Sequence, residues 1–150
     1  MIKILLPTDG SVRSLDAVRH VIHLIHCGLK ARLVVANVQP PANLYEMVVA
    51  HDPGVIQKVS EAAAHDLMRP ALKLLQAAGH PAEMAVGSGD AAHMLIELLE
   101  NHDCTAVIVS SRGAGDSEDV TPGSVAQTLL DSCPVPVTLV KPSQPSARID

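Results

Sequence analysis

The sequence predicts an α/β fold, a three-layer sandwich in which a five-stranded parallel, doubly wound sheet lies between about four helices. Two observations predict it. Short apolar runs alternate with helical patterns along the chain, and these runs are apolar at nearly every position instead of every second one. Strands of this kind are buried on both faces, as in a parallel sheet covered by helices. With 150 residues, 47% of them hydrophobic, the chain has the size of one compact domain.

The chain opens with a strand, a turn and a helix. The strand is expected at Ile2–Leu6, an apolar run that Pro7 and Gly10 bring to an end. Ser11 is the expected helix cap. Apolar side chains then recur at helical spacing, at Leu15, Val18, Ile22, Ile25 and Leu29.

The remaining elements repeat the alternation of strands and helices. Pro70 lies inside the longest helix and is expected to kink it, because proline lacks a backbone N–H. Residues 1–141 should form the domain, and residues 142–150 a mobile tail. The expected elements are a strand at Ala31–Val38, a helix at Val55–Ala78, a strand at Ala82–Val86, a helix from its cap Asp90 to about Glu100, a strand at Ala106–Val109, a helix at Ser124–Leu130 and a strand at Val135–Val140.

Composition and charge argue against several classes of partner. Tyr45 is the sole aromatic residue and the net charge is −5, so nucleic acid is not an expected partner. The cysteines Cys27, Cys104 and Cys133 are odd in number and far apart, which suits a reducing compartment better than a disulfide framework. The sequence shows no signal peptide and no run of about 18 apolar residues, so a cytoplasmic protein without membrane partners is expected.

Two polar loops are predicted to meet in a ligand-binding crevice. In a doubly wound sheet of order 3-2-1-4-5, the carboxyl ends of the first and fourth strands flank the switch point where ligands bind. Pro7-Thr8-Asp9 follows the first strand, and the loop from Ser110 to Ser124 follows the fourth. The small residues of this loop can turn backbone amides toward phosphate just before a helix N-terminus. A bound nucleotide is therefore the main functional hypothesis.

These segments resemble the universal stress protein family over residues 2–141. The resemblance rests on Pro7-x-Asp9-x-Ser11, on Asn37-Val38, on Gly89-Asp90 and on the motif small-x2-Gly-x9-Gly-Ser before Val125, with Cys133-Pro-Val-Pro-Val after it. It implies a five-stranded adenine-nucleotide-binding fold. Some members of the family bind ATP and others do not, and most form dimers through the last strand.

The resemblance also implies roles for individual residues. Pro7, Asp9 and Val38 match positions around the adenosine, with Thr8 between the first two. The positions that match the ribose and phosphate loop are Gly113, Gly123, Ser124 and Val125.

Two departures from the family pattern bear on the ligand. Ser110 stands where the motif has its first glycine, so its side chain could crowd the ribose or hydrogen-bond to it. The spacer carries Asp116, Glu118 and Asp119, with Arg112 as the loop's cation. These carboxylates oppose a triphosphate unless a divalent cation such as Mg2+ intervenes or they face solvent.

Simpler interpretations exist for most of these motifs. Asp9, Ser11 and Gly123-Ser124 can serve as helix caps without any ligand. The segment Gly87–Ala92 matches a dinucleotide fingerprint, but a carboxylate at Asp90 would repel a pyrophosphate, which favours a cap there. His20, His23 and His26 step around the first helix, so we expect solvated histidines and no metal site.

The expected function is that of a cytosolic stress-response module whose crevice holds ATP or a related adenine nucleotide. Binding of the nucleotide is expected to alter a surface that contacts an unknown protein partner. No catalytic residues are assigned, because the sequence contains no GxSxG, HExxH or GxxxxGK[ST] motif. Two alternatives remain: a nucleotide-free dimeric interaction protein and a weak ATPase. The hydrophobic run Val135–Val140 at the sheet edge predicts a homodimer.

Overall fold

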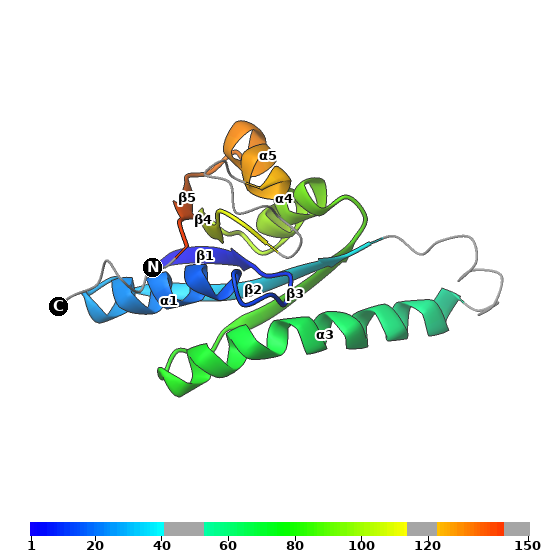
Figure 1. Ribbon diagram of the computed structural model, residues 1–150, viewed down its shortest axis with the longest axis horizontal. Helices are drawn as coiled ribbons and strands as arrows, with labels where there is room; N and C mark the ends of the chain where they lie inside the picture. The colour runs from blue at the N-terminus through cyan, green and yellow to red at the C-terminus, as the bar shows by residue number, and fades with distance from the viewer. Residues whose placement is uncertain (41–52, 114–122, 143–150) are drawn as a thin grey trace.

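A computed structural model describes residues 1–40, 53–113 and 123–142 of the chain. A five-stranded parallel sheet of order β3-β2-β1-β4-β5 lies between two layers of helices (Figure 1). Helices α1 and α3 cover one face, and α4 and α5 cover the other. Both the predicted fold class and the predicted strand order are confirmed. The elements are β1 Ile2–Pro7, α1 Leu15–His26, β2 Ala31–Gln39, α3 Pro53–Ala77, β3 Glu83–Ser88, α4 Ala91–Asn101, β4 Ala106–Ser110, α5 Ser124–Ser132 and β5 Val137–Val140.

The sheet is buried on both faces. Successive side chains of a strand point to opposite sides, so Ile4 and Leu6 of β1 pack toward α1 and α3. Leu5 packs toward α4 and α5, and all three side chains are at most 1% exposed. This two-sided burial is the physical reason for the apolar character of every position in the central strands.

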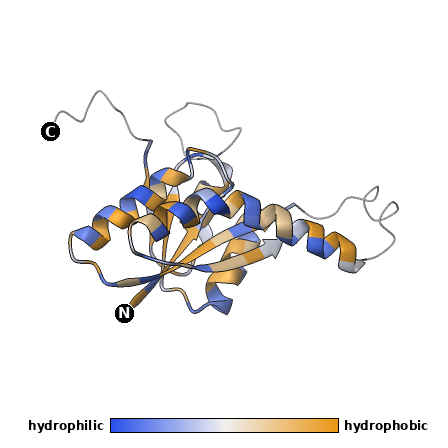
Figure 2. Ribbon diagram, turned by 90° about the horizontal axis from the view of Figure 1, so that it is seen from below, coloured by the Kyte–Doolittle hydropathy of each residue, from blue (hydrophilic) through white to orange (hydrophobic). Residues whose placement is uncertain are grey.

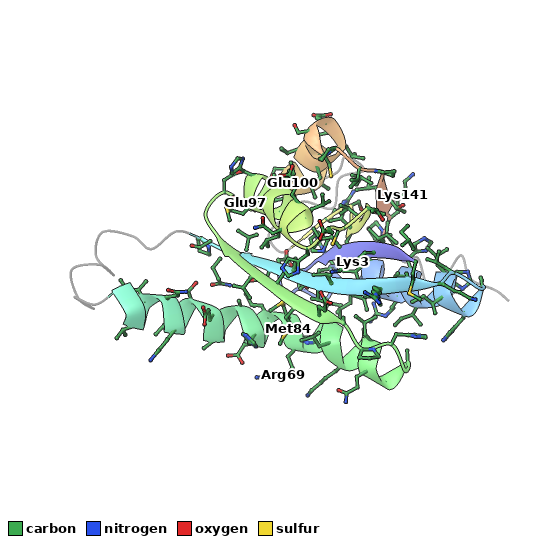
Figure 3. The ribbon with its side chains drawn as sticks, turned by 180° about the vertical axis from the view of Figure 1, so that it is seen from behind. Lys3, Arg69, Met84, Glu97, Glu100 and Lys141 are labelled. Atoms are coloured by element: carbon green, nitrogen blue, oxygen red, sulfur yellow. The ribbon has the colours of Figure 1, made fainter. Side chains whose placement is uncertain are left out.

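The helices separate their apolar and polar faces. Figure 2 shows strands that are mainly hydrophobic, crossed by helices on which hydrophilic and hydrophobic residues alternate. In Figure 3, Arg69 projects outward from α3, while Glu97 and Glu100 lie on α4, and all three are exposed. Met84 lies on the edge strand β3 and is 45% exposed. In the part of the chain that is described, no helix is long and apolar enough to span a membrane.

The start of the first helix differs from the prediction. Helix α1 begins at Leu15 with Ser14 at its N-cap, not directly after Ser11. Residues 11–14 form a turn, in which the Ser11 N–H donates to Asp9 Oδ1 at 2.9 Å and the Ser14 N–H donates to Ser11 Oγ at 3.2 Å. These short side-chain bonds compete with helical ones and delay the helix by one turn. At its other end, α1 stops before Leu29.

Helix α3 continues through Pro70, and the kink expected there stays a prediction. The helix runs without a break through the proline, although a backbone hydrogen bond is lost there (Figure 1). Met68 and Ala71 on either side are fully buried, while Pro70 itself is exposed. Packing of the buried side thus holds the helix together across the missing bond.

Candidate functional site

A cavity of about 230 Å3 opens at the carboxyl ends of β1, β2 and β4. Every residue that the sequence predicted for the site lies on its wall. These residues are Pro7, Thr8, Asp9, Val38, Ser110, Arg112, Gly113, Gly123, Ser124 and Val125. They come together because parallel strands all end at the same edge of the sheet, and because β1 and β4 are neighbours at the switch point.

The wall also contains residues that sequence reasoning missed. Asn37 is part of the family resemblance but was given no role there, and it is buried on the cavity wall. As a polar residue near the end of an apolar strand it carried a detectable signal. Ser14 and Ser111 lie close in sequence to predicted residues. Ala91 and Leu95 come from α4, and nothing in their local sequence indicates that this helix borders the cavity.

Hydrogen bonds within the loop after β1 occupy the hydroxyl of Thr8. Its Oγ1 lies 2.8 Å from Ser14 Oγ and accepts the Gly10 N–H at 3.3 Å. The Ser14 hydroxyl donates its one hydrogen to the Ser11 carbonyl at 2.7 Å, so Thr8 must be the donor in the Thr8–Ser14 pair. The Thr8 side chain therefore holds the loop in shape and has no hydrogen left to offer a ligand.

Ser110 reaches across the molecule to the start of α1. Its buried Oγ accepts the N–H of Ala17 at 3.1 Å, a bond between residues 93 positions apart. Ala17 is the third residue of α1, and the N-cap residue Ser14 makes no side-chain cap bond. Ser110 thus supplies from β4 the cap that the N-cap residue normally supplies. Ser110, which stands at the first glycine position of the motif, therefore accepts a hydrogen bond from the first turn of α1.

Asn37 joins the ends of β1 and β2 beneath the cavity. Its Nδ2 donates to the Thr8 carbonyl at 2.8 Å, and its Oδ1 accepts from Gln39 Nε2 at 2.7 Å. The backbone reinforces the connection, because the Thr8 N–H donates to the Ala36 carbonyl at 2.9 Å. The floor of the cavity is therefore fixed by the protein's own hydrogen bonds.

Helix α5 points its start at the cavity. Gly123 is its N-cap and has no side chain with which to cap the helix. The Gly123 N–H donates to the Ser111 carbonyl at 2.7 Å, and the Ser111 N–H donates to Val140 at 2.8 Å, which anchors this corner to β5. The N–H groups of a first helical turn lack intrahelical partners and carry partial positive charge. Since Ser124 and Val125 line the cavity, this end of it suits an anion.

Charge around the cavity is sparse. Among the described lining residues, Asp9 and Arg112 carry the charged side chains. Asp9 is exposed at the rim, and Arg112 is partly exposed on the side of β4. The acidic residues Asp116, Glu118 and Asp119, and the tail from residue 143 onward, lie outside the described residues.

The segment that matches a dinucleotide fingerprint forms a helix cap. Asp90 is the N-cap of α4, and its Oδ2 accepts the His93 N–H at 3.1 Å, as predicted. Ala91 borders the cavity, whereas Gly87 and Gly89 are not among its described lining residues.

Comparison with known proteins agrees with the resemblance found in the sequence. Residues 1–141 match the model of the Universal stress protein family. Universal stress protein MJ0531 of Methanocaldococcus jannaschii is 22% identical over 139 residues, which cover 93% of this chain and 81% of that protein. The solved structure of hypothetical protein MJ0577 has a TM-score of 0.75 at 21% identity, covering 95% of this chain and 97% of that one.

Other structures of the same fold contain adenine nucleotides. One is a universal stress protein in complex with cAMP, with a TM-score of 0.63, 22% identity and coverage of 93% of this chain and 95% of that one. Another is the Arabidopsis thaliana family protein At3g01520 with AMP bound, with a TM-score of 0.65, 13% identity and coverage of 100% and 97%. A third is the universal stress protein from Archaeoglobus fulgidus in complex with dAMP, with a TM-score of 0.64, 14% identity and coverage of 94% and 98%.

Proposed function

The chain belongs to the universal stress protein family, and from this membership and the cavity we propose that it binds ATP or a related adenine nucleotide as a regulatory module of the cytosolic stress response. The observation that carries the proposal is the convergence of the motif residues from β1, β2, β4 and α5 on one cavity. The nucleotides held by similar structures, cAMP, AMP and dAMP, support the adenine nucleotide class.

The lining residues of the cavity suit the different parts of a nucleotide. Val38 and Leu95 offer apolar contact to a base, and the Asp9 carboxylate is an acceptor for hydroxyl donors such as those of a ribose. The start of α5, together with the Arg112 guanidinium, offers N–H donors to phosphate. A triphosphate brings more negative charge than one cation offsets, so Mg2+ is the expected companion of ATP.

The residues that line the cavity favour binding over catalysis. The described lining residues include no histidine, cysteine or lysine that could serve as general base or nucleophile. Phosphoryl transfer depends on several positioned charges around the transferred group, and Arg112 supplies one. Any ATP hydrolysis is therefore proposed to be slow and incidental. Turnover above background that disappears in Asp9→Ala would instead establish the weak ATPase alternative.

Titration calorimetry with AMP, cAMP and Mg-ATP tests the proposal. Gly123→Val places a branched side chain on the cavity wall at the start of α5, whereas Ala62→Val makes a similar addition on the exposed outside of α3. The wild type and Ala62→Val should bind with equal affinity. Gly123→Val should bind at least about tenfold more weakly, a loss of about 1.4 kcal/mol.

Two results would contradict this assignment. Equal affinity of Gly123→Val and wild type would move the ligand to another part of the molecule. No binding of any of the three nucleotides at millimolar concentration would favour the alternative, a nucleotide-free interaction protein. Two features favour that alternative. The Ser110 hydroxyl is hydrogen-bonded to the start of α1, and the spacer of the motif is acidic.

Both versions of the function include a homodimer formed through residues 135–140. Strand β5 is an edge of the sheet, and an uncovered hydrophobic edge invites pairing with a second copy. Pro136 has no N–H to donate, so the pairing must use its neighbours. Light scattering should report a dimer, and a monomer that persists at high micromolar concentration would refute it.

A further inference from the structure

The C-terminal end of α1 carries a histidine and a cysteine whose donor atoms lie side by side. A weak hydrogen bond joins His23 Nε2 and Cys27 Sγ, which are 3.7 Å apart, and both residues are exposed. A metal ion between the two atoms would take the place of this hydrogen bond. Cys27 follows the last residue of the helix with helical backbone angles, φ −83° and ψ −1°. The pair therefore keeps the i, i+4 spacing that puts two side chains on one helix face. The spacing of the three histidines alone does not predict this pair, because its second metal-ligating atom is the sulfur of Cys27.

The separation of the two donor atoms matches the bite of a tetrahedral zinc ion. With Zn–N near 2.0–2.1 Å and Zn–S near 2.3 Å, a tetrahedral angle places nitrogen and sulfur about 3.5 Å apart. Helical zinc sites use the same i, i+4 spacing in the HExxH motif. The observed 3.7 Å thus needs only a small adjustment of the side chains to hold one ion.

The chemistry of the donors selects the type of metal. A thiolate and an imidazole together favour zinc and other borderline or soft ions over Mg2+ and Ca2+, which prefer oxygen. The position also favours a cation, because the last carbonyl groups of a helix carry partial negative charge. The site lies at the end of α1 opposite to Ser14, which borders the nucleotide cavity, so it is separate from that cavity.

We infer that His23 and Cys27 form a two-residue chelate for a zinc-type divalent cation. Among the described residues, no group of three or more histidine, cysteine, aspartate or glutamate side chains is placed to hold a metal. Water therefore completes the coordination, and the ion exchanges readily with solvent. The neighbouring His26 belongs to a different contact, with its ring centroid 5.8 Å from that of His80.

Zinc titration of the full chain tests the inference. The protein is kept reduced with a phosphine and free of nucleotide, which itself binds metals, and it competes with a chromogenic chelator for Zn2+. One equivalent should bind to the wild type. His23→Gln and Cys27→Ser should each weaken binding by about tenfold or more, because each donor raises the effective concentration of the other. His26→Gln and Cys133→Ser are the matched controls and should bind as the wild type does.

Cobalt provides a second readout on the same variants. Co2+ should produce a thiolate charge-transfer band in the wild type and in His26→Gln, and the band should be absent in Cys27→Ser. Circular dichroism verifies that each variant is folded. Loss of zinc affinity in Cys27→Ser but not in His23→Gln would show binding through the thiol alone and overturn the chelate. Equal affinity of all variants, or no zinc binding by the wild type, would overturn it as well.

Discussion

Replacement of Ser110 by alanine should destabilise the protein by removing a cap that comes from a distant strand. The Ser110 hydroxyl accepts the Ala17 N–H at 3.1 Å, and Ala17 is 0% exposed. Without the hydroxyl, that N–H is left buried without its partner, which costs about 1–3 kcal/mol. Loss of an N-cap side chain costs about 0.5–2 kcal/mol in other helices. We therefore expect the free energy of unfolding to fall by about 1–2 kcal/mol.

Urea unfolding followed by circular dichroism measures this change. The midpoint should move to lower urea while the slope m stays constant, because the surface exposed on unfolding is nearly unchanged. Ser132→Ala, at the exposed end of α5, is the control and should stay within about 0.5 kcal/mol of the wild type. If Ser110→Ala also stays within that range, the hydrogen bond from Ala17 to Ser110 contributes nothing measurable to stability and the prediction is wrong.

Three further predictions concern glycine geometry, thiol ionisation and thiol access. Gly10 and Gly79 have nearly equal φ, +84° and +83°, and a Cβ on Gly79 would meet nothing within 4 Å. A Cβ on Gly10 would lie 2.5 Å from Leu67 Cδ2, which can move aside, but also 3.2 Å from Leu67 Cβ and 3.3 Å from its backbone Cα, which cannot move without shifting α3. In urea unfolding, Gly10→Ala should therefore cost about 1–3 kcal/mol more than Gly79→Ala, and equal costs would rule out the steric account. Burial raises the pKa of Cys104 above its ordinary value of 9.0, so its contribution to stability is complete below pH 9 and is lost as pH rises toward the raised pKa. Above pH 9, the free energy of unfolding of the wild type should fall relative to that of Cys104→Ala. The fall should reach up to about 1.4 kcal/mol for each pH unit by which the pKa of Cys104 in the folded state exceeds that in the unfolded state. Parallel pH profiles of the two proteins would refute this. A thiol reagent should modify exposed Cys27 before buried Cys104, as peptide mass mapping would show, and the opposite order would contradict the described burial.

The architecture was predictable because local and global signals agree. Apolar runs such as Ala31–Val38 are buried on both faces in the structure, and proline or glycine residues end most of them. The cavity followed from the strand order, which fixes the edge where the loops meet. Several boundaries differ from the expected ones by two or three residues. The start of α1 is displaced where Asp9, Ser11 and Ser14 offer competing local hydrogen bonds within one short segment.

The parts of the site that sequence could not supply are contacts between distant segments. The bond from Ala17 to Ser110 spans 93 positions, and no local pattern distinguishes that serine from one facing a ligand. The direction of the Thr8–Ser14 hydrogen bond likewise depends on the Ser11 carbonyl, which claims the hydrogen of Ser14. In both cases sequence indicated a polar residue at the cavity, and the structure identified its partner.

If the cavity holds an adenine nucleotide, the purified protein should carry one, and identifying its bound ligand tests this without any added nucleotide. The protein is denatured and removed by filtration, and the filtrate is analysed by absorbance near 260 nm and by mass spectrometry. We expect an adenine nucleotide in the wild-type filtrate at a level approaching one per chain, and far less from Gly123→Val prepared in parallel. A wild-type filtrate without nucleotide, from protein that also fails to bind added AMP, cAMP or Mg-ATP, would show that the cavity is not an adenine nucleotide site.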